Sequence, residues 1–414
     1  MIMLQTLGKQ AKEAAAVLAC APRALKDNAL NAIADALIAK TPYILEANAQ
    51  DLQNGRDAGM NQGLLDRLAL SEARIAGMAQ GVREVAAAAD PVGRVLWGET
   101  RPNGLQIRKI SVPLGVIAVI FEARPNVTSD AAALCLKAGN AVILRGGKEA
   151  IRSNTAIAAC MREAAEEAGL PRDCIQLVED TSRDSANALM KMNDYVDVLI
   201  PRGGAGLIRA VVQNATVPVI ETGTGNCHVY IDKDADLDMA EKIVFNAKVS
   251  RPSVCNACES LLVHRAIADR AIPQVCAKLQ TANVEIRGDE TVCALVPDAV
   301  PAAEEDYAKE FLDYIISVKV VDSLDEAVRH IAKNGTGHSE CIVTENYDAA
   351  QQFLSRVDAA AVYVNASTRF TDGGEFGFGA EIGISTQKLH ARGPLGLQNL
   401  TAEKYIILGS GQVR

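Results

Sequence analysis

The amino-acid sequence predicts an α/β protein with a doubly wound parallel sheet, a second α/β domain, and a hairpin arm with a tail strand. Three observations lead to this fold class. Apolar runs of strand length alternate with helical segments from residue 113 onward, as in βαβ units. A second series of the same kind follows residue 255. Before the first series, an alternating segment is interrupted by Asn103-Gly104, which is a strong signal for a tight hairpin turn.

The first ninety or so residues are expected to be helical. Ala, Leu, Glu and Lys dominate, and glycines and prolines stand between segments. Thr41-Pro42 is typical of a helix start. Next, Arg94 to Thr100 and Leu105 to Val112 are expected to form the arm, which pairs with a partner subunit or folds back on its own domain.

The first α/β series is expected to have strands at 115–121, 141–144, 175–178, 196–200 and 217–220, with helices at 129–138, 150–168, 185–192 and 205–212. Ligands of such sheets bind beyond the carboxyl ends of the strands. The glycine turns predicted at those ends are Arg145-Gly146-Gly147-Lys148, Pro201-Arg202-Gly203-Gly204 and Gly223-Thr224-Gly225-Asn226.

The second series is expected to have strands near 261, 286, 318, 342 and 362, with helices from 266, 323 and 348. These patterns predict a first domain over 1–249, a second over 250–383, and a return to the first over 384–414. The tail, Lys404 to Gln412, contains an apolar strand, Tyr405 to Leu408. We expect this strand to pair with the arm of another subunit.

The composition narrows the function classes. The chain has 414 residues, 49% hydrophobic and 22% charged, with a net charge of −9. This balance argues against nucleic acid or an anionic membrane as the main partner, and an anionic substrate needs a local basic pocket. Ten cysteines without regular spacing fit a reducing compartment. Because the N-terminal residues also lack the order of a secretion signal, we expect a cytoplasmic protein.

Cys255 is the candidate nucleophile. It lies in a proline-containing turn, Ser250 to Asn256, between a predicted helix and a predicted strand. Arg251 and nearby backbone N–H groups favour the reactive thiolate. The alternative is a small buried apolar side chain, as most free cysteines are.

Cys258 completes a Cys-x-x-Cys pair, which alone indicates a redox pair or half of a zinc site. No second pair of this spacing follows, and the five histidines are scattered. We therefore expect no metal, one nucleophile, and one bystander that can oxidise onto it.

A nucleotide cofactor would need an unusual binding mode, because the standard glycine motifs for dinucleotides and nucleoside triphosphates are missing. The turns 145–148 and 201–204 precede helices, where free N–H groups attract phosphate. Arg145 and Lys148 suit a ribose 2′-phosphate and so favour NADP over NAD. The alternative for each turn is a loop that needs glycine for its backbone conformation.

Motifs along essentially the whole chain resemble the aldehyde dehydrogenase superfamily. They include the run Glu221 to Asn226, Cys255, and the late segment Glu375 to Ile384. Five segments resemble the members that reduce γ-glutamyl phosphate in proline biosynthesis: 121–127, 221–228, 251–256, 334–340 and 387–394. The resemblance implies an aldehyde dehydrogenase-like fold, with a cofactor domain, a catalytic domain, and oligomerisation through arm and tail.

The resemblance also implies residue roles. Cys255 is the nucleophile, and the side-chain amide of Asn126 forms an oxyanion hole with the Cys255 N–H. Cofactor-binding residues are Arg145, Gly146, Gly147, Lys148, Arg202, Gly203, Gly204, Glu221, Gly223, Glu375 and Phe376. Candidate cations for the substrate are Arg124, Arg251 and His338. Cys258 departs from the pattern, because an apolar residue is expected there.

The implied reaction is reduction of L-glutamyl 5-phosphate by NADPH through a thioester on Cys255. Glu221 lies where hydrolytic relatives keep a general base. A reductase must not activate water, so Glu221 is expected to face the cofactor or to be turned away. The implied partners are copies of the same chain and a γ-glutamyl kinase. Three alternatives remain: a hydrolytic NAD(P)-dependent aldehyde dehydrogenase, a cofactor-free cysteine hydrolase or acyltransferase, and a non-catalytic scaffold.

Overall fold

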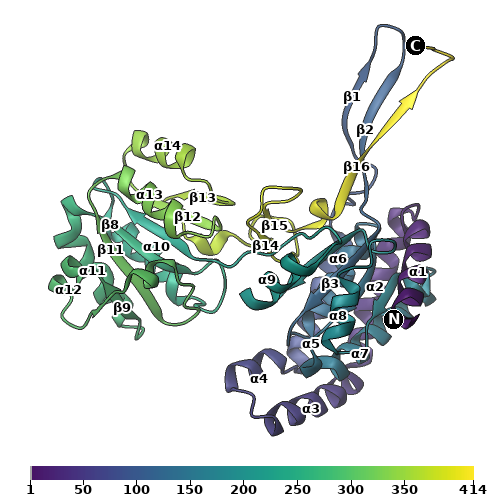
Figure 1. The fold of residues 1–414 in the computed structure, drawn as a ribbon, viewed down its shortest axis with the longest axis horizontal. Helices are drawn as coiled ribbons and strands as arrows, with labels where there is room; N and C mark the ends of the chain where they lie inside the picture. The colour runs from purple at the N-terminus through teal and green to yellow at the C-terminus, as the bar shows by residue number, and fades with distance from the viewer. Residues whose placement is uncertain (1) are drawn as a thin grey trace. The chain divides into compact units, whose positions relative to one another are not determined.

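The computed structural model of the chain describes residues 2–414 and divides into two compact units (Figure 1). Unit 1 comprises the chain up to Thr222 together with Gly377–Gly383 and Leu395–Arg414. Unit 2 comprises Gly223–Phe376 and Ile384–Pro394. The division falls after residue 222, whereas the sequence analysis put it after residue 249. The reason is a strand that was not expected, β7 (Cys227–Ile231), which pairs within the sheet of unit 2.

The expected helical region is confirmed. It contains α1 (Ile2–Leu18), α2 (Arg23–Ala39), α3 (Thr41–Asp57), α4 (Gln62–Leu68) and α5 (Glu72–Ala87). The side chains of Asn61 and Ser71 accept hydrogen bonds from the first turns of α4 and α5. These caps satisfy backbone N–H groups that a helix start leaves unpaired.

Unit 1 is built on a parallel sheet with the strand order β5-β4-β3-β6. The strands are β3 (Val116–Phe121), β4 (Ala141–Arg145), β5 (Ile175–Leu177) and β6 (Val198–Arg202). The helices between and after them are α6 (Asn126–Lys137), α7 (Ile151–Glu167), α8 (Arg183–Leu189) and α9 (Ala205–Asn214). The strand expected at 217–220 is wrong, because only Val219 forms an isolated bridge, to Leu199. The strand order reverses between β3 and β6, which is where doubly wound sheets bind ligands.

The arm is a three-stranded antiparallel sheet with the order β1-β2-β16. Its strands are β1 (Val95–Thr100), β2 (Gln106–Pro113) and β16 (Thr401–Leu408), drawn in blue and yellow in Figure 1. The tail strand pairs with the arm of its own chain, from Thr401 opposite Pro113 to Leu408 opposite Gln106. The expected pairing of this strand with another subunit's arm is therefore corrected: β16 fills the free edge of β2, and β1 and β16 become the outer edges.

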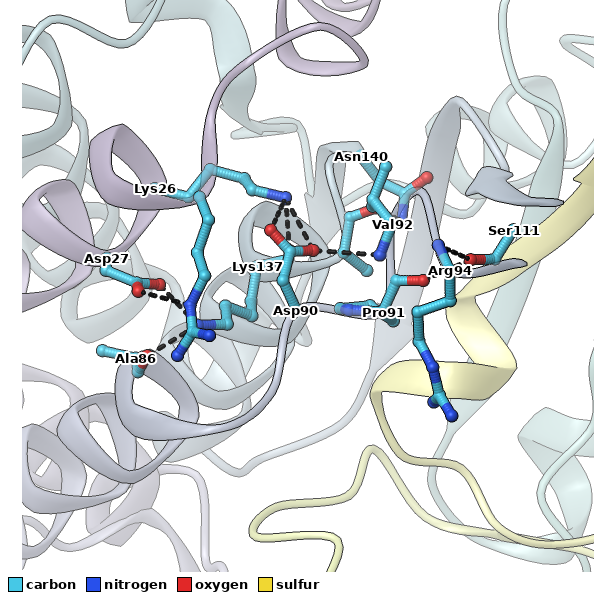
Figure 2. A network of polar contacts seen from close by, with 12 residues as sticks. Lys26, Asp27, Ala86, Asp90, Pro91, Val92, Arg94, Ser111, Lys137 and Asn140 are labelled. Atoms are coloured by element: carbon cyan, nitrogen blue, oxygen red, sulfur yellow. Dashed lines mark hydrogen bonds and ion pairs between the residues drawn. The ribbon is translucent and has the colours of Figure 1, made fainter. Parts of the chain in front are cut away.

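A buried polar network fixes the segment that leads into the arm (Figure 2). Lys26 Nζ lies 2.8 Å from Asp90 Oδ2 and donates to the carbonyl of Lys137 at 3.1 Å. Asp90 Oδ1 also accepts from the N–H of Val92 at 2.9 Å, and Lys137 pairs with Asp27. Lys26 and Lys137 are almost fully buried. Their ion pairs with Asp90 and Asp27 offset the free-energy cost of burying the two charges.

Unit 2 contains a seven-stranded parallel sheet with the order β10-β9-β11-β8-β7-β12-β13. Besides β7, its strands are β8 (Cys258–His264), β9 (Glu285–Gly288), β10 (Val300–Pro301), β11 (Ile315–Val321), β12 (Ser339–Val343) and β13 (Ala361–Val364). Its helices are α10 (Leu237–Val249), α11 (Ala268–Gln280), α12 (Glu290–Leu295), α13 (Leu324–Asn334) and α14 (Tyr347–Arg356). A short pair, β14 (Ile384–Ser385) with β15 (Gly393–Pro394), completes the unit.

Alternate residues of β7 serve the two faces of this sheet. Val229 and Ile231 belong to the core cluster that includes side chains of α10 and α11. Tyr230 belongs to the other cluster, with Ile331 and Phe353. The strands predicted near 261, 286, 318, 342 and 362 are present as β8, β9, β11, β12 and β13, which confirms the second α/β series. In the part of the chain that the structure describes, no helix is both long and apolar enough to cross a membrane.

Candidate active site

In unit 1, the predicted cofactor turns 145–148 and 201–204 lie at the carboxyl ends of β4 and β6. Glu122, just after β3, accepts a hydrogen bond from the N–H of Gly204 at the start of α9, at 2.9 Å. A Cβ at Gly203 would stand only 2.7 Å from the carboxyl group of Glu122. A side chain at 203 would therefore displace the Glu122 carboxyl group, and in this structure the chain's own carboxylate uses one N–H of the predicted phosphate site.

The two cationic residues of the 145–148 turn, Arg145 and Lys148, differ in their contacts and in their exposure to solvent. Arg145 Nη2 donates to the carbonyls of Thr181 and Ser182, at 2.7 and 2.9 Å, and burial lowers the pKa of its guanidinium. Lys148 is exposed. Arg145 thus has a structural role in holding a loop, and Lys148 is the more accessible charge for a ribose phosphate.

Asn126 is the first residue of α6 and is exposed. Its Nδ2 donates to Asp130 Oδ2, one turn later, at 2.9 Å. Burial raises the pKa of Asp130 to about 6, although the hydrogen bonds from Asn126 and Ser129 oppose that rise. Asp130 fixes the orientation of the Asn126 amide and leaves its second N–H for another acceptor.

Arg124 and Glu221, both half-buried, also belong to unit 1. The oxyanion role of Asn126 remains a prediction, because Asn126 lies in unit 1 and Cys255 in unit 2.

In unit 2, Cys255 lies half-buried between α10 and β8, at the amino end of β8. Its carbonyl accepts a hydrogen bond from Cys227 Sγ at 3.1 Å. A Cβ at Gly225 would overlap that carbonyl, so only glycine fits. The N–H of Gly225 donates to Glu310 Oε1 at 2.7 Å. Part of the glycine run expected to bind cofactor therefore packs against the cysteine turn.

Gly223, at the start of that run, donates its N–H to the carbonyl of Ile384 at 2.7 Å. It lies against the side chain of Thr386. This contact gives Gly223 a structural role as well as the predicted cofactor role.

The cysteines around Cys255 are buried. Burial raises the pKa of Cys258 to about 12, against the nearby charge of Lys248, and burial also raises the pKa of Cys227 well above its usual value. Both are therefore protonated thiols near neutral pH and poor nucleophiles. Among residues 2–414, no group of three or more His, Cys, Asp or Glu side chains is arranged to hold a metal ion.

His338 does not offer the cation that was expected of it. The side chain is fully buried, and burial lowers its pKa to about 4. Its Nδ1 lies 2.8 Å from Ser339 Oγ and 3.6 Å from Cys227 Sγ. The ring is therefore neutral near pH 7. It contacts Cys227, whose Sγ donates to the carbonyl of Cys255.

Arg369 is a site residue that the sequence analysis missed. It follows β13 and donates Nε–H to Ser250 Oγ at 3.2 Å and Nη1–H to Asn256 Oδ1. Burial lowers its pKa, and so does the charge of Arg251, while Cys255 acts in the opposite direction. No sequence pattern links Arg369 to the turn, because 113 residues separate it from Asn256.

Glu375 and Phe376 are exposed at the end of a turn in unit 2. Asp372 Oδ1 accepts from the N–H groups of Gly374 and Glu375, at 2.9 and 3.4 Å. The predicted contact of Glu375 and Phe376 with the nicotinamide ribose remains a prediction.

Comparison with known proteins gives one consistent result. The model of the aldehyde dehydrogenase family matches residues 7–298 and 292–384. The γ-glutamyl phosphate reductase of Clostridium novyi is 63% identical over 404 residues, covering 98% of this chain and 97% of that protein. The γ-glutamyl phosphate reductase of Moorella thermoacetica is 61% identical over 411 residues, covering 99% and 98%. The crystal structure of γ-glutamyl phosphate reductase from Thermotoga maritima matches with a TM-score of 0.97 at 49% identity, covering 99% of each chain.

Proposed function

Because the chain belongs to the aldehyde dehydrogenase family, and within it to the γ-glutamyl phosphate reductases, we propose that it reduces L-glutamyl 5-phosphate. The products are L-glutamate 5-semialdehyde and phosphate, the cofactor is NADPH, and the step belongs to proline biosynthesis. The observation that carries this proposal is the similarity along essentially the whole chain. The half-buried Cys255, set among buried thiols, supports it.

The residues of unit 1 fit a nicotinamide dinucleotide phosphate. The start of α9 lies at the switch point of the sheet, where N–H groups attract phosphate. Lys148 is exposed on the turn after β4, as a 2′-phosphate requires. A cofactor phosphate that binds the N–H of Gly204 must displace the carboxylate of Glu122, which accepts from it at 2.9 Å. When bound, the cofactor supplies the hydride that reduces the thioester.

Cys255 acts as the nucleophile. Its thiolate attacks the acyl carbon, the S–C bond forms, and the C–O bond to phosphate breaks. The oxyanion that develops is stabilised by the Cys255 N–H and the Asn126 amide, whose orientation Asp130 fixes. Loss of one such donor typically lowers kcat on the order of 10²–10³-fold.

The thioester must be kept from water, so Glu221 has no role as a general base in this proposal. The competing function is a hydrolytic aldehyde dehydrogenase, in which Glu221 activates water. The same site residues serve both functions, and the difference lies in what resolves the thioester.

The reverse reaction separates the two functions. Purified protein receives glutamate 5-semialdehyde and NADP⁺, and NADPH formation is followed with and without inorganic phosphate. A strict requirement for phosphate supports the reductase, because phosphate must resolve the thioester. Equal rates without phosphate mean that water does so, and the hydrolytic function replaces the proposal.

A further inference from the structure

The guanidinium of Arg369 is fixed against both ends of the cysteine turn. Its Nε donates to Ser250 Oγ at 3.2 Å, and its Nη1 donates to Asn256 Oδ1. Asn256 Nδ2 donates in return to the carbonyls of Arg369 and Thr371, at 3.3 and 2.9 Å. These reciprocal bonds hold a positive charge beside the turn that carries Cys255.

Arg251 supplies a second positive charge in the same turn. Its side chain is exposed, and its charge lowers the pKa of Arg369, so the two guanidinium groups repel each other. Within the described residues, neither arginine forms an ion pair. Like charges held close together repel each other, and binding of an anion relieves that repulsion.

Two nearby carboxylates act on Arg369 without forming an ion pair with it in the described part of the chain. Asp372 and Glu375 attract Arg369, but Asp372 Oδ1 accepts the backbone N–H groups of Gly374 and Glu375. The chain has a net charge of −9, yet among its described residues these two arginines beside Cys255 have no ion-pair partner.

We propose that Arg251 and Arg369 bind the phosphate group of the acyl phosphate beside Cys255, and bind inorganic phosphate in the reverse direction. This inference rests on the proposed function. Guanidinium groups suit a phosphate because their N–H groups match its oxygens in pairs. When the C–O bond breaks, its electron pair stays on the phosphate, which takes a proton from water, and the two arginines stabilise this leaving group.

The α-carboxylate of the substrate is the other anion that guanidinium groups recognise. Phosphate is favoured because it is bonded to the acyl carbon that Cys255 attacks, whereas the α-carboxylate lies at the opposite end of the glutamyl chain. Arg369 contacts Asn256, the residue next to Cys255. The kinetic test therefore measures each anion separately.

In the reverse reaction, Arg369→Gln is expected to raise the KM for phosphate at least tenfold and to leave the KM for glutamate 5-semialdehyde within about twofold. Arg369→Lys keeps the positive charge but loses the paired N–H groups, so its KM for phosphate should lie between those of the wild type and Arg369→Gln. Arg265→Gln, which removes an exposed arginine of unit 2 paired with Asp322, is the control and should change neither KM. A rise in the KM for the semialdehyde alone would assign the pair to the α-carboxylate and overturn the proposal.

A second measurement does not depend on substrate identity. Cys255 is alkylated with anionic iodoacetate or neutral iodoacetamide, and modification is read at its peptide by mass spectrometry. The wild-type protein should show an iodoacetate-to-iodoacetamide rate ratio that inorganic phosphate lowers. Arg369→Gln and Arg251→Gln should each lower that ratio several-fold.

The two measurements also separate the failure of this inference from that of the proposed function. If NADP⁺ reduction needs no phosphate but the alkylation ratio falls in the variants, the proposed function fails and the anion site remains. If phosphate is required but the ratio is unchanged in both variants, the arginine pair does not bind the anion and the inference is wrong.

Discussion

At the scale of single residues, the environments of the cysteines decide which one reacts. Cys255→Ala is expected to abolish activity, because no other thiol in the Cys255 turn is available. Cys258→Ala should keep most of the activity, because Cys258 is buried and burial raises its pKa to about 12. Steady-state rates of both variants test this. If activity survives in Cys255→Ala but not in Cys258→Ala, the nucleophile is Cys258 and the assignment of Cys255 is wrong.

His338 gives a pH-dependent stability. Burial lowers its pKa from 6.5 to about 4, so between these values the unfolded chain binds a proton that the folded chain does not. Its contribution to the free energy of unfolding is complete above pH 6.5 and is lost as the pH falls toward 4. Between pH 7 and pH 5 the loss is about 2 kcal/mol.

His338→Asn keeps a polar atom near the position of Nδ1 and removes the titration. The drop in unfolding free energy from pH 7 to pH 5 should therefore be about 2 kcal/mol smaller in this variant than in the wild type. Urea unfolding at both pH values measures it. Other titrating groups act in both proteins and cancel in the difference. An identical drop in both proteins would mean that His338 is protonated in the folded state.

The residue roles proposed from the sequence rest on local motifs, and they stay predictions. The turn around Cys255 and the asparagine at the start of α6 both belong to short motifs. The burial that makes His338 neutral, and the approach of Arg369 to Asn256 across 113 residues, depend on how distant segments pack.

At the scale of elements, one buried ion pair joins α10 to β8 on either side of the cysteine turn. Lys248 Nζ lies 2.5 Å from Glu259 Oε2, and both side chains are fully buried. Burial raises the pKa of Glu259 to about 7, although the charge of Lys248 opposes that rise. Glu259 also accepts from the N–H of Leu312 at 3.1 Å.

Lys248→Met leaves Glu259 buried without its partner, which typically costs about 3–5 kcal/mol of unfolding free energy. The cost should be greatest at pH 8, where Glu259 is ionised, and smaller at pH 5.5, where it takes up a proton. Denaturant unfolding at both pH values measures this. Lys333→Met, in an exposed pair with Glu304, is the control and should change stability by less than about 1 kcal/mol. If Lys248→Met and Lys333→Met lose the same unfolding free energy, the buried Lys248–Glu259 pair contributes no more to stability than the exposed pair.

The sequence predicted most elements, and the errors have physical reasons. β7 begins with Cys227 and His228 directly after a glycine run, so it lacks the apolar run that identified other buried strands, although all five of its residues are buried. The segment 217–220 has a β-branched, apolar pattern but makes only one bridge, through Val219. Local composition does not reveal whether a neighbouring strand offers a free edge.

At the scale of the whole molecule, the outer strands of the arm suit assembly. β1 exposes Val95, Leu96 and Trp97, and β16 exposes Tyr405 and Ile407. Unpaired edges with apolar side chains are sites for another chain. We propose that the chain forms a homo-oligomer through these two strands.

Trp97→Asp combined with Ile407→Asp should therefore shift the protein to smaller species in sedimentation velocity, because each places a charge on one edge. Tyr347→Asp, at an exposed aromatic of α14, is the control and should leave the mass unchanged. An unaltered mass in the double variant would rule out the arm as the interface.

The arm also has a consequence for how the chain is made. Its last strand, β16, pairs with β2 across a long separation in sequence, with Leu408 opposite Gln106. Beyond β16, Gln412 Nε2 donates to the carbonyl of Asn103, 309 residues earlier. On the ribosome, β1 and β2 emerge long before β16, so the edge of β2 stays open while most of the polypeptide is still being translated. An open edge can pair with a neighbouring nascent chain. Slow translation of the region between the two strands should therefore increase aggregation, whereas a chaperone that shields the hairpin should reduce it.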